Sequence, residues 1–174
     1  WTEIAALVTP LTKAWCTDTG TEVASLGIQV HGGMGFIEET GAAQHLRDAG
    51  ITTIYEGTTG IQANDLVGRK VGREEGRTAL ALIAQMEKDV NVAPLREATD
   101  WIVKTFGTNP AAVAAGSVYY LKLMGITCGG WLMARSAKIC RRPAISSGSS
   151  MGLRLRMAIR PQMEPPSSRS GVPT

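Results

Sequence analysis

The chain has 174 residues, of which 44% are hydrophobic and 5% are aromatic. This length is enough for a domain with a substantial core, and this composition suits packed helices better than a β-sandwich. The formal charge of +3 arises from residues 141–174, which hold six arginines and one acid; the remaining 140 residues have 12 basic and 14 acidic side chains. That near-neutral balance excludes a strongly basic surface of the kind that binds nucleic acid.

The cysteines and histidines show no pattern of a metal site. Cys16, Cys128 and Cys140 are far apart, and the two histidines are His31 and His45. Because no CxxC pair or Cys/His ligand spacing is present, we expect no metal, no disulfide scaffold and a reducing, cytoplasmic location. No charged segment followed by an apolar one opens the sequence, so we expect no signal peptide.

Helices separated by turns are predicted for the first third of the chain. Residues 3–15 are apolar and helical in pattern, and Pro10 predicts a kink or break within them. Asp18 and Thr19 are suitable N-caps for a second helix, which would end at the glycines of residues 32–35.

The next segment contains the only stretch that we expect to be extended. A short helix is predicted from Glu38 to Asp48. Residues 51–55 (Ile-Thr-Thr-Ile-Tyr) are rich in β-branched side chains, which favour extended backbone. Thr58 or Thr59 can cap the helix that follows.

Apolar spacing predicts further helices in the second half of the chain. Within residues 74–92, one helical face carries Ala79, Ile83, Met86 and Val90. A helix is also predicted over residues 95–106, between two prolines.

The segment from residue 111 to residue 134 is almost uncharged, and its length alone would suit a membrane span. Lys122 lies in its middle, and many of its residues are Ala, Gly, Ser or Thr, which favours a buried bundle helix. Gly125 and Gly129 would let a neighbouring helix approach closely. The predicted core stripe of this helix is Leu121, Met124, Cys128 and Trp131.

Residues 141–174 differ in composition from the rest of the chain. They hold five of the eight prolines and many serines, a composition that cannot build an apolar core. We expect them to be disordered, or to be a non-native tail produced by a frameshift. The rest of the chain is predicted to be all-α.

The segment from Gln29 to Gln62 combines features that are uninformative one by one. A glycine turn after a helix is most often a helix C-cap. A single loop glutamate such as Glu56 is usually solvated. A single histidine such as His31 more often lies at the surface or packs against other side chains than contacts a ligand. Arg47 and Asp48 would more often form a structural ion pair than a catalytic one.

In combination and in this order, these features resemble a known family. The patterns are Gln29-x-x-Gly32-Gly33-x-Gly35-Phe36, Arg47-Asp48-Ala49 and Ile54-Tyr55-Glu56-Gly57-Thr58, and they are similar to the C-terminal signature of acyl-CoA dehydrogenases. The resemblance is strong over residues 20–71. Over residues 7–134 it extends to the long branch of the family, that of the methylthiopropionyl-CoA dehydrogenases, which has an extra helical region. The tail from Arg141 matches no part of the family pattern.

This resemblance implies an all-α fold in three parts. Residues 1–72 would be the C-terminal part of the acyl-CoA dehydrogenase four-helix bundle, residues 73–140 an additional helical region, and residues 141–174 the tail. The family's N-terminal helical domain and middle β-domain, which supply much of the acyl-CoA and flavin-ring sites, have no counterpart in this sequence. We therefore expect the chain alone to bind FAD poorly and to be inactive.

The resemblance also implies a reaction, the α,β-dehydrogenation of an acyl-CoA thioester. A carboxylate removes the α-proton while FAD takes the β-hydride, and Glu56 matches that carboxylate. Because the α-proton is only weakly acidic, the base has to work in a dry pocket with donors at the thioester oxygen. In the family these donors are the backbone N–H of the catalytic glutamate and a flavin ribityl hydroxyl.

Two segments match the family's cofactor contacts. One would touch the adenosine diphosphate part of a flavin held by a neighbouring subunit: Gln29, Val30, His31, Gly32 and Gly33. The other is the flavin-contact turn: Gly57, Thr58, Thr59 and Gly60. Many family members have Gln at the position of Gly60, so any side-chain contact from there is lost. The implied partners are an acyl-CoA substrate, an electron-transferring flavoprotein and further copies of the chain in a homodimer or homotetramer, with no nucleic acid and no membrane span.

Two other functions stay open. An acyl-CoA oxidase would keep the fold but pass the electrons to oxygen. A catalytically silent flavoprotein or helical oligomerisation module would not need Glu56, whose presence favours an enzyme.

Overall fold

The computed structural model describes residues 2–140, and within this range it contains helices and turns but no β-strand. The all-α prediction is confirmed for this part of the chain, whereas the expectations for residues 141–174 lie outside the described residues. The helices in order are α1 (Thr2–His31), α2 (Gly33–Phe36), the 3₁₀-helix η1 (Glu38–Thr40), α3 (Ala42–Thr52), α4 (Thr59–Asp65), the π-helix η2 (Leu66–Gly72), α5 (Arg77–Met86), α6 (Ala93–Phe106), α7 (Pro110–Ala115) and α8 (Ser117–Cys140).

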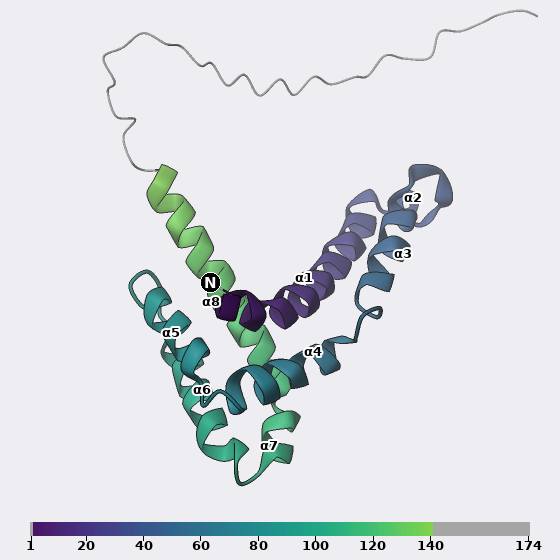
Figure 1. Ribbon diagram of the computed structural model, residues 1–174. Coiled ribbons are helices and arrows are strands. Elements are labelled where there is room, and N and C mark those ends of the chain that lie inside the picture. The colour runs from purple at the N-terminus through teal and green to yellow at the C-terminus, as the bar shows by residue number, and fades with distance from the viewer. Residues whose placement is uncertain (1, 141–174) are drawn as a thin grey trace, which may run out of the picture. The chain divides into compact units, whose positions relative to one another are not determined.

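One hydrophobic core joins the N-terminal half of α1 to the helices from α4 onward. Figure 1 shows α1 crossing α8, with α3 running beside the distal half of α1. Each fully buried aliphatic side chain contributes about 1.5–3 kcal/mol. Residues from both sides of residue 72 contribute to this core. The domain boundary that the resemblance implies at residue 72 stays a prediction. The largest fully buried side chains include Leu7, Leu66, Val67, Val71, Ile83, Met86, Leu95, Leu121 and Met124.

The first prediction to fail is the break in α1. Pro10 lies inside one continuous helix of 30 residues, and Asp18 does not cap a second one. A proline in a helix interior removes a hydrogen bond and usually bends or ends the helix. Here Pro10 is buried in the core together with Leu7, Leu11 and Ala14, so tertiary packing outweighs the local penalty. The predicted stop at the glycines is confirmed, because α1 ends at His31.

The extended segment predicted at residues 51–55 is also wrong. Helix α3 continues through Thr52, and a turn follows it. The hydroxyl of Thr52 donates to the Ala49 carbonyl oxygen at 2.6 Å, and that of Thr53 donates to the Gly50 carbonyl oxygen at 2.9 Å. Such local side-chain bonds let threonine sit at a helix end despite its preference for strands. The short helix predicted from Glu38 divides at Gly41, which has a φ of 76°.

The helices of the second half are shorter or divided relative to the prediction. The helix predicted over residues 74–92 is α5, which starts only after Glu75 and Gly76, both with positive φ. The apolar segment from residue 111 divides at Gly116 into α7 and α8. The helix predicted over residues 95–106 is confirmed as α6. Among the helices of residues 2–140, none is long and apolar enough to cross a membrane.

Candidate functional site

Glu56, the predicted base, lies in the turn between α3 and α4. Its φ is 57° and that of Gly57 is 97°, so both residues have left-handed backbone. For a residue with a side chain this conformation costs roughly 1–2 kcal/mol, and it persists only where the surroundings enforce it. The Glu56 side chain is exposed. The described residues therefore do not supply the dry surroundings that an α-proton base requires.

Two side chains from other elements hold the carbonyl groups of this turn. Gln62 of α4 donates from Nε2 to the Glu56 carbonyl oxygen at 3.0 Å. Lys13 of α1 donates from Nζ to the Gly57 carbonyl oxygen at 2.5 Å. The carbonyl groups of Glu56 and Gly57 therefore each accept a hydrogen bond from a side chain. The donor to Gly57, Lys13, is charged.

The start of α4 is tied to α1 as well. Thr59 donates from its hydroxyl to both carboxylate oxygens of Asp18, at 2.9 and 3.1 Å. Thr58 occupies the N-cap position in extended conformation, yet its side chain makes no capping hydrogen bond, and it is exposed. The hydroxyl of Thr58 is thus available to a ligand, whereas that of Thr59 is engaged in the fold.

Sequence reasoning missed Lys13 and Gln62 and misread Asp18. The partners of Lys13 and Asp18 lie 44 and 41 residues away in the sequence, so no local pattern connects them. Gln62 is the last residue of the segment from Gln29 to Gln62. Only its spacing of six residues from Glu56 could have suggested a contact between them.

The glycines of the turn after α1 differ in why glycine is needed at each position. Gly32 has a φ of 61°, which ends α1. Gly35 is buried, and a Cβ there would lie 2.5 Å from the Ile28 carbonyl oxygen, so only glycine fits. Around Gly33 a Cβ would meet nothing within 4 Å. Residues 29–33 are all exposed, which leaves their backbone accessible. The ring of His31 has a local partner, because its Nδ1 lies 2.9 Å from the Gly27 carbonyl oxygen.

The two predicted segments lie at different places along α1. Asp18 contacts the Glu56 turn through Thr59, whereas His31 ends the helix. At 1.5 Å per helical residue, roughly 20 Å of α1 separates them. One chain therefore does not bring the glycine turn and Glu56 into a single pocket.

Arg47 and Asp48 do not pair with each other. Arg47 donates to both carboxylate oxygens of Glu38, at 2.9 and 2.7 Å, and Asp48 accepts from Gln44 at 2.6 Å. Successive helical residues point in different directions, so adjacent side chains on a helix rarely face each other. The hydrogen bonds to Glu38 raise the pKa of Arg47. The ion pair expected between neighbours is instead one between α3 and η1.

The distal half of α1 and α2 expose an apolar surface. Val23, Leu26 and Val30 follow one helical face, and Met34 and Phe36 continue it into α2; Val30 is 86% exposed and Phe36 79%. We call these five residues the arm surface. Large contiguous apolar patches on a protein mark places where another surface packs.

Two family models match consecutive parts of the chain. The model described as "Acyl-CoA dehydrogenase, C-terminal domain" matches residues 3–71, and the one described as "Acetyl-CoA dehydrogenase C-terminal like" matches residues 68–150. The chain belongs to the acyl-CoA dehydrogenase family. The second match passes the point at Arg141 where the sequence resemblance was expected to end, so that expectation is corrected for residues 141–150.

Similar curated proteins are acyl-CoA dehydrogenases from several organisms. The 3-methylmercaptopropionyl-CoA dehydrogenase of Ruegeria pomeroyi is 43% identical, over 89% of this chain and 30% of its own length. A broad-specificity linear acyl-CoA dehydrogenase of Mycobacterium tuberculosis is 29% identical, over 76% of the chain and 26% of its own length. Human short-chain specific acyl-CoA dehydrogenase is 41% identical, over 33% of the chain and 14% of its own length. The chain thus spans less than a third of the length of each of these relatives.

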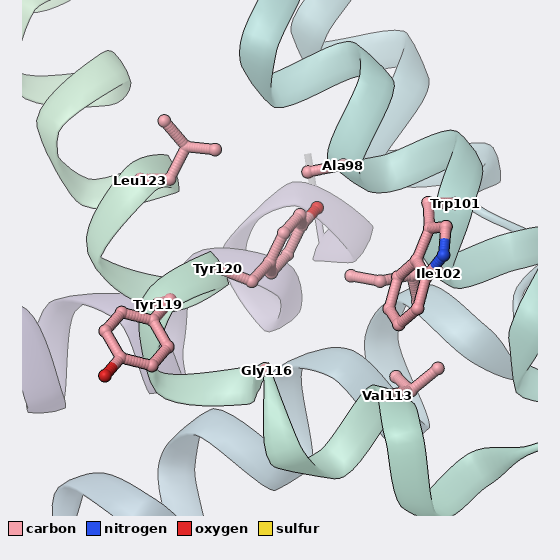
Figure 2. A pocket seen from close by; sticks show the side chains of 8 residues that line it. All are labelled: Ala98, Trp101, Ile102, Val113, Gly116, Tyr119, Tyr120 and Leu123. Carbon is pink, nitrogen blue, oxygen red and sulfur yellow. The ribbon is translucent and has the colours of Figure 1, made fainter.

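The part of the chain matched by the second model contains an apolar pocket of about 210 Å³. Figure 2 shows it between α6, α7 and α8, with the Tyr120 ring projecting between the helices and Tyr119 turned away. The Tyr120 hydroxyl lies 2.9 Å from the Thr99 hydroxyl, and burial raises the pKa of Tyr120 to about 12. No predicted site residue lines this pocket, and its lining contains no Asp, Glu, His, Lys, Arg or Cys side chain. The lining residues are Ala98, Trp101, Ile102, Val113, Gly116, Tyr119, Tyr120 and Leu123.

No metal centre emerges from the described part of the chain. Within residues 2–140, no group of three or more His, Cys, Asp or Glu side chains is placed to hold a metal ion. Cys16, Cys128 and Cys140 are free thiols.

Proposed function

We propose that this chain is the C-terminal part of an FAD-dependent acyl-CoA dehydrogenase in which Glu56 removes the substrate α-proton. The reaction is the α,β-dehydrogenation of an acyl-CoA thioester. A general base of this kind typically contributes a factor of about 10²–10⁴ to the rate. The exposed carboxylate of Glu56 would gain the base strength that it needs when the acyl-CoA and the rest of the enzyme exclude water from it.

The observation that carries the proposal is the set of unused donors at the Glu56 turn. None of the hydrogen bonds found within residues 2–140 uses the backbone N–H of Glu56 or of Gly57 as a donor. A thioester whose α-proton is being removed develops negative charge on its carbonyl oxygen, and fixed N–H donors stabilise such charge. The turn therefore offers a base and a free N–H donor in the same residue, as the reaction requires.

The residues around the two predicted cofactor segments fit a flavin dinucleotide. A Cβ at Gly32, Gly33 or Gly60 would meet nothing within 4 Å, so a ligand can approach the backbone there. The exposed hydroxyl of Thr58 would contact the flavin, with Gly57, Thr59 and Gly60 shaping the same turn. When bound, FAD supplies the hydride acceptor. Gln29, Val30 and His31, with the two glycines that follow, would hold the adenosine diphosphate part.

We further propose that the active protein is a homodimer or homotetramer. Gln29 to Gly33 lie roughly 20 Å along α1 from the Glu56 turn. The flavin that these residues contact can therefore be a different one from the flavin beside Glu56. The apolar arm surface beside them would pack against another part of the enzyme. This arrangement agrees with a segment that serves the flavin of a neighbouring subunit.

The expected electron acceptor is an electron-transferring flavoprotein. An acyl-CoA oxidase would use the same base but would reoxidise its flavin with oxygen. Stopped-flow reoxidation of the substrate-reduced enzyme in air, compared with reoxidation by the flavoprotein, separates the two. Rapid reoxidation in air would favour the oxidase.

The test of the base is Glu56→Gln in the full-length enzyme that carries this chain. We expect the variant to retain FAD and to lose turnover with acyl-CoA by at least about a hundredfold. The matched control is Glu75→Gln, because Glu75 is also an exposed glutamate with left-handed backbone (φ 52°) followed by a glycine. Glu75→Gln should keep wild-type turnover; turnover of Glu56→Gln within twofold of wild type would rule out the proposal.

A further inference from the structure

Two Glu-Gly pairs in this chain both have positive φ values but are held in opposite ways. Glu75 and Gly76 have φ values of 52° and 71°, and Glu56 and Gly57 have values of 57° and 97°. In the pair at residues 75–76 both N–H groups donate to backbone carbonyls, of Gly72 at 3.3 Å and of Val71 at 2.9 Å. That turn is closed by its own backbone and leaves no free donor.

The pair at residues 56–57 is held through its carbonyl groups instead. Gln62 bonds to the Glu56 carbonyl oxygen and Lys13 to that of Gly57, while the N–H groups of both residues have no acceptor within residues 2–140. A left-handed glutamate without backbone bonds of its own depends on these side chains. This arrangement keeps the donors free, which the backbone-closed turn at residues 75–76 does not.

Lys13 contacts the residues on both sides of Glu56. Its ammonium nitrogen donates to the Gly57 carbonyl oxygen at 2.5 Å and lies 5.9 Å from the centroid of the Tyr55 ring. Both contacts are of kinds that a cation strengthens. Lys13 lies on α1, one residue before the buried Ala14, so its position is fixed by the core rather than by the turn.

We propose that Lys13 is a positioning residue that holds the Glu56 turn in its left-handed conformation, with the carboxylate and the N–H donor of Glu56 presented together. This inference rests on the proposed role of Glu56. Lys13 acts on the reaction only through that residue and need not touch the substrate. Its removal therefore affects the rate of proton removal more than the binding of acyl-CoA.

The test compares Lys13→Met with Lys13→Arg in the full-length enzyme. Lys13→Met removes the donor and the charge at similar length, and displacing a catalytic group by a small distance can cost as much as 10²-fold in rate. We expect kcat to fall about tenfold or more while KM changes less than threefold and FAD content is retained. Lys13→Arg, which keeps a charged donor, should recover kcat to within threefold of wild type. The control Lys122→Met replaces an exposed lysine of α8 and should behave as wild type.

A double variant separates this inference from the proposed function. If Lys13 acts through Glu56, adding Lys13→Met to Glu56→Gln should change the residual turnover less than twofold. A further tenfold loss, or wild-type kcat in Lys13→Met, would overturn the positioning role and leave Glu56 as the base. Wild-type turnover in Glu56→Gln would instead remove the proposed function itself. Should Lys13→Met lose FAD, Lys13→Leu, which also lacks a donor, replaces it in the comparison, and equal kcat in the Leu and Arg variants would overturn the role.

Discussion

Trp15 of α1 lies directly over Gly125 of α8 where the two helices cross. A Cβ added to Gly125 would come within 2.6 Å of Cγ of the Trp15 indole, closer than such atoms approach in proteins. Four residues further on, a Cβ at Gly129 would lie 3.4 Å from the same ring, at an ordinary contact distance. The close approach predicted for these two glycines is therefore confirmed, and Gly125 is the one that requires it.

Gly125→Ala should destabilise the chain. Alanine is favoured over glycine within a helix by about 1 kcal/mol, but overpacking a close contact costs typically about 1–3 kcal/mol. We expect a net decrease of up to about 2 kcal/mol in the free energy of unfolding, measured by urea denaturation of the 174-residue chain. Gly130→Ala is the control, because nothing lies within 4 Å of a Cβ there; it should be neutral or stabilising. A Gly125→Ala variant as stable as Gly130→Ala would contradict the close crossing.

Apolar spacing was a sound guide to helices and a poor one to their ends. It placed Ala79, Ile83 and Met86 on one face, and all three are buried. It could not foresee that Pro10 would sit inside α1, because that depends on core residues contributed by later helices. It also could not foresee the left-handed residues at 75 and 76, since glutamate rarely adopts that backbone and no sequence rule predicts it there.

For the candidate site, the sequence pattern named the residues and the structure supplied their neighbours. Glu56, Gly57 and Thr58 are recognisable from their order in the chain alone. Lys13, which bonds to Gly57, and Asp18, which bonds to the neighbouring Thr59, come from a helix more than 40 residues earlier. Such contacts arise from tertiary packing, which a local pattern does not contain.

The left-handed backbone of Glu56 predicts an inverted preference for glycine over alanine. Glycine adopts a positive φ without steric cost, whereas alanine pays roughly 1–2 kcal/mol. We expect Glu56→Gly to have a free energy of unfolding about 1 kcal/mol higher than Glu56→Ala. At Ala81, an exposed position of α5, Ala81→Gly should instead lower that free energy by about 1 kcal/mol. Equal stability of the two Glu56 variants in denaturant titrations would show that the turn is not left-handed in solution.

Asp89 connects the turn after α5 to the C-terminal half of α8. Its carboxylate accepts from Lys138 Nζ at 2.5 Å and from the Trp131 indole N–H at 2.9 Å. These two hydrogen bonds, that of Lys138 first, hold the pKa of Asp89 below its ordinary value. A carboxyl whose pKa is lower in the folded than in the unfolded chain stabilises the fold above its unfolded-state pKa of about 3.9. That stabilisation is lost as the pH falls through the lower folded-state pKa.

Asp89→Asn should therefore lower the melting temperature at pH 7, and its difference from wild type should shrink as the pH falls below about 4. Melting followed by circular dichroism between pH 3 and pH 7 measures both values. Asp100→Asn is the control, because Asp100 lies on α6 and forms no ion pair in the part of the chain that the structure describes. A deficit in Asp89→Asn that stays constant down to pH 3 would contradict the proposed linkage.

The three thiols should differ in their reactivity. Cys16 and Cys140 are exposed, whereas Cys128 is partly buried on α8 with its Sγ 3.8 Å from the Met86 sulfur. Burial raises the pKa of Cys128 from 9.0 to about 11, which lowers its thiolate fraction at pH 8 by about a hundredfold. The thiolate is the reactive form. A disulfide reagent at pH 8 should therefore label two thiols quickly and the third slowly, until denaturant is added. Cys128→Ser should abolish the slow phase, and Cys140→Ser should remove one fast equivalent. Three fast thiols in the native chain would show that the packing around Met86 does not shield Cys128.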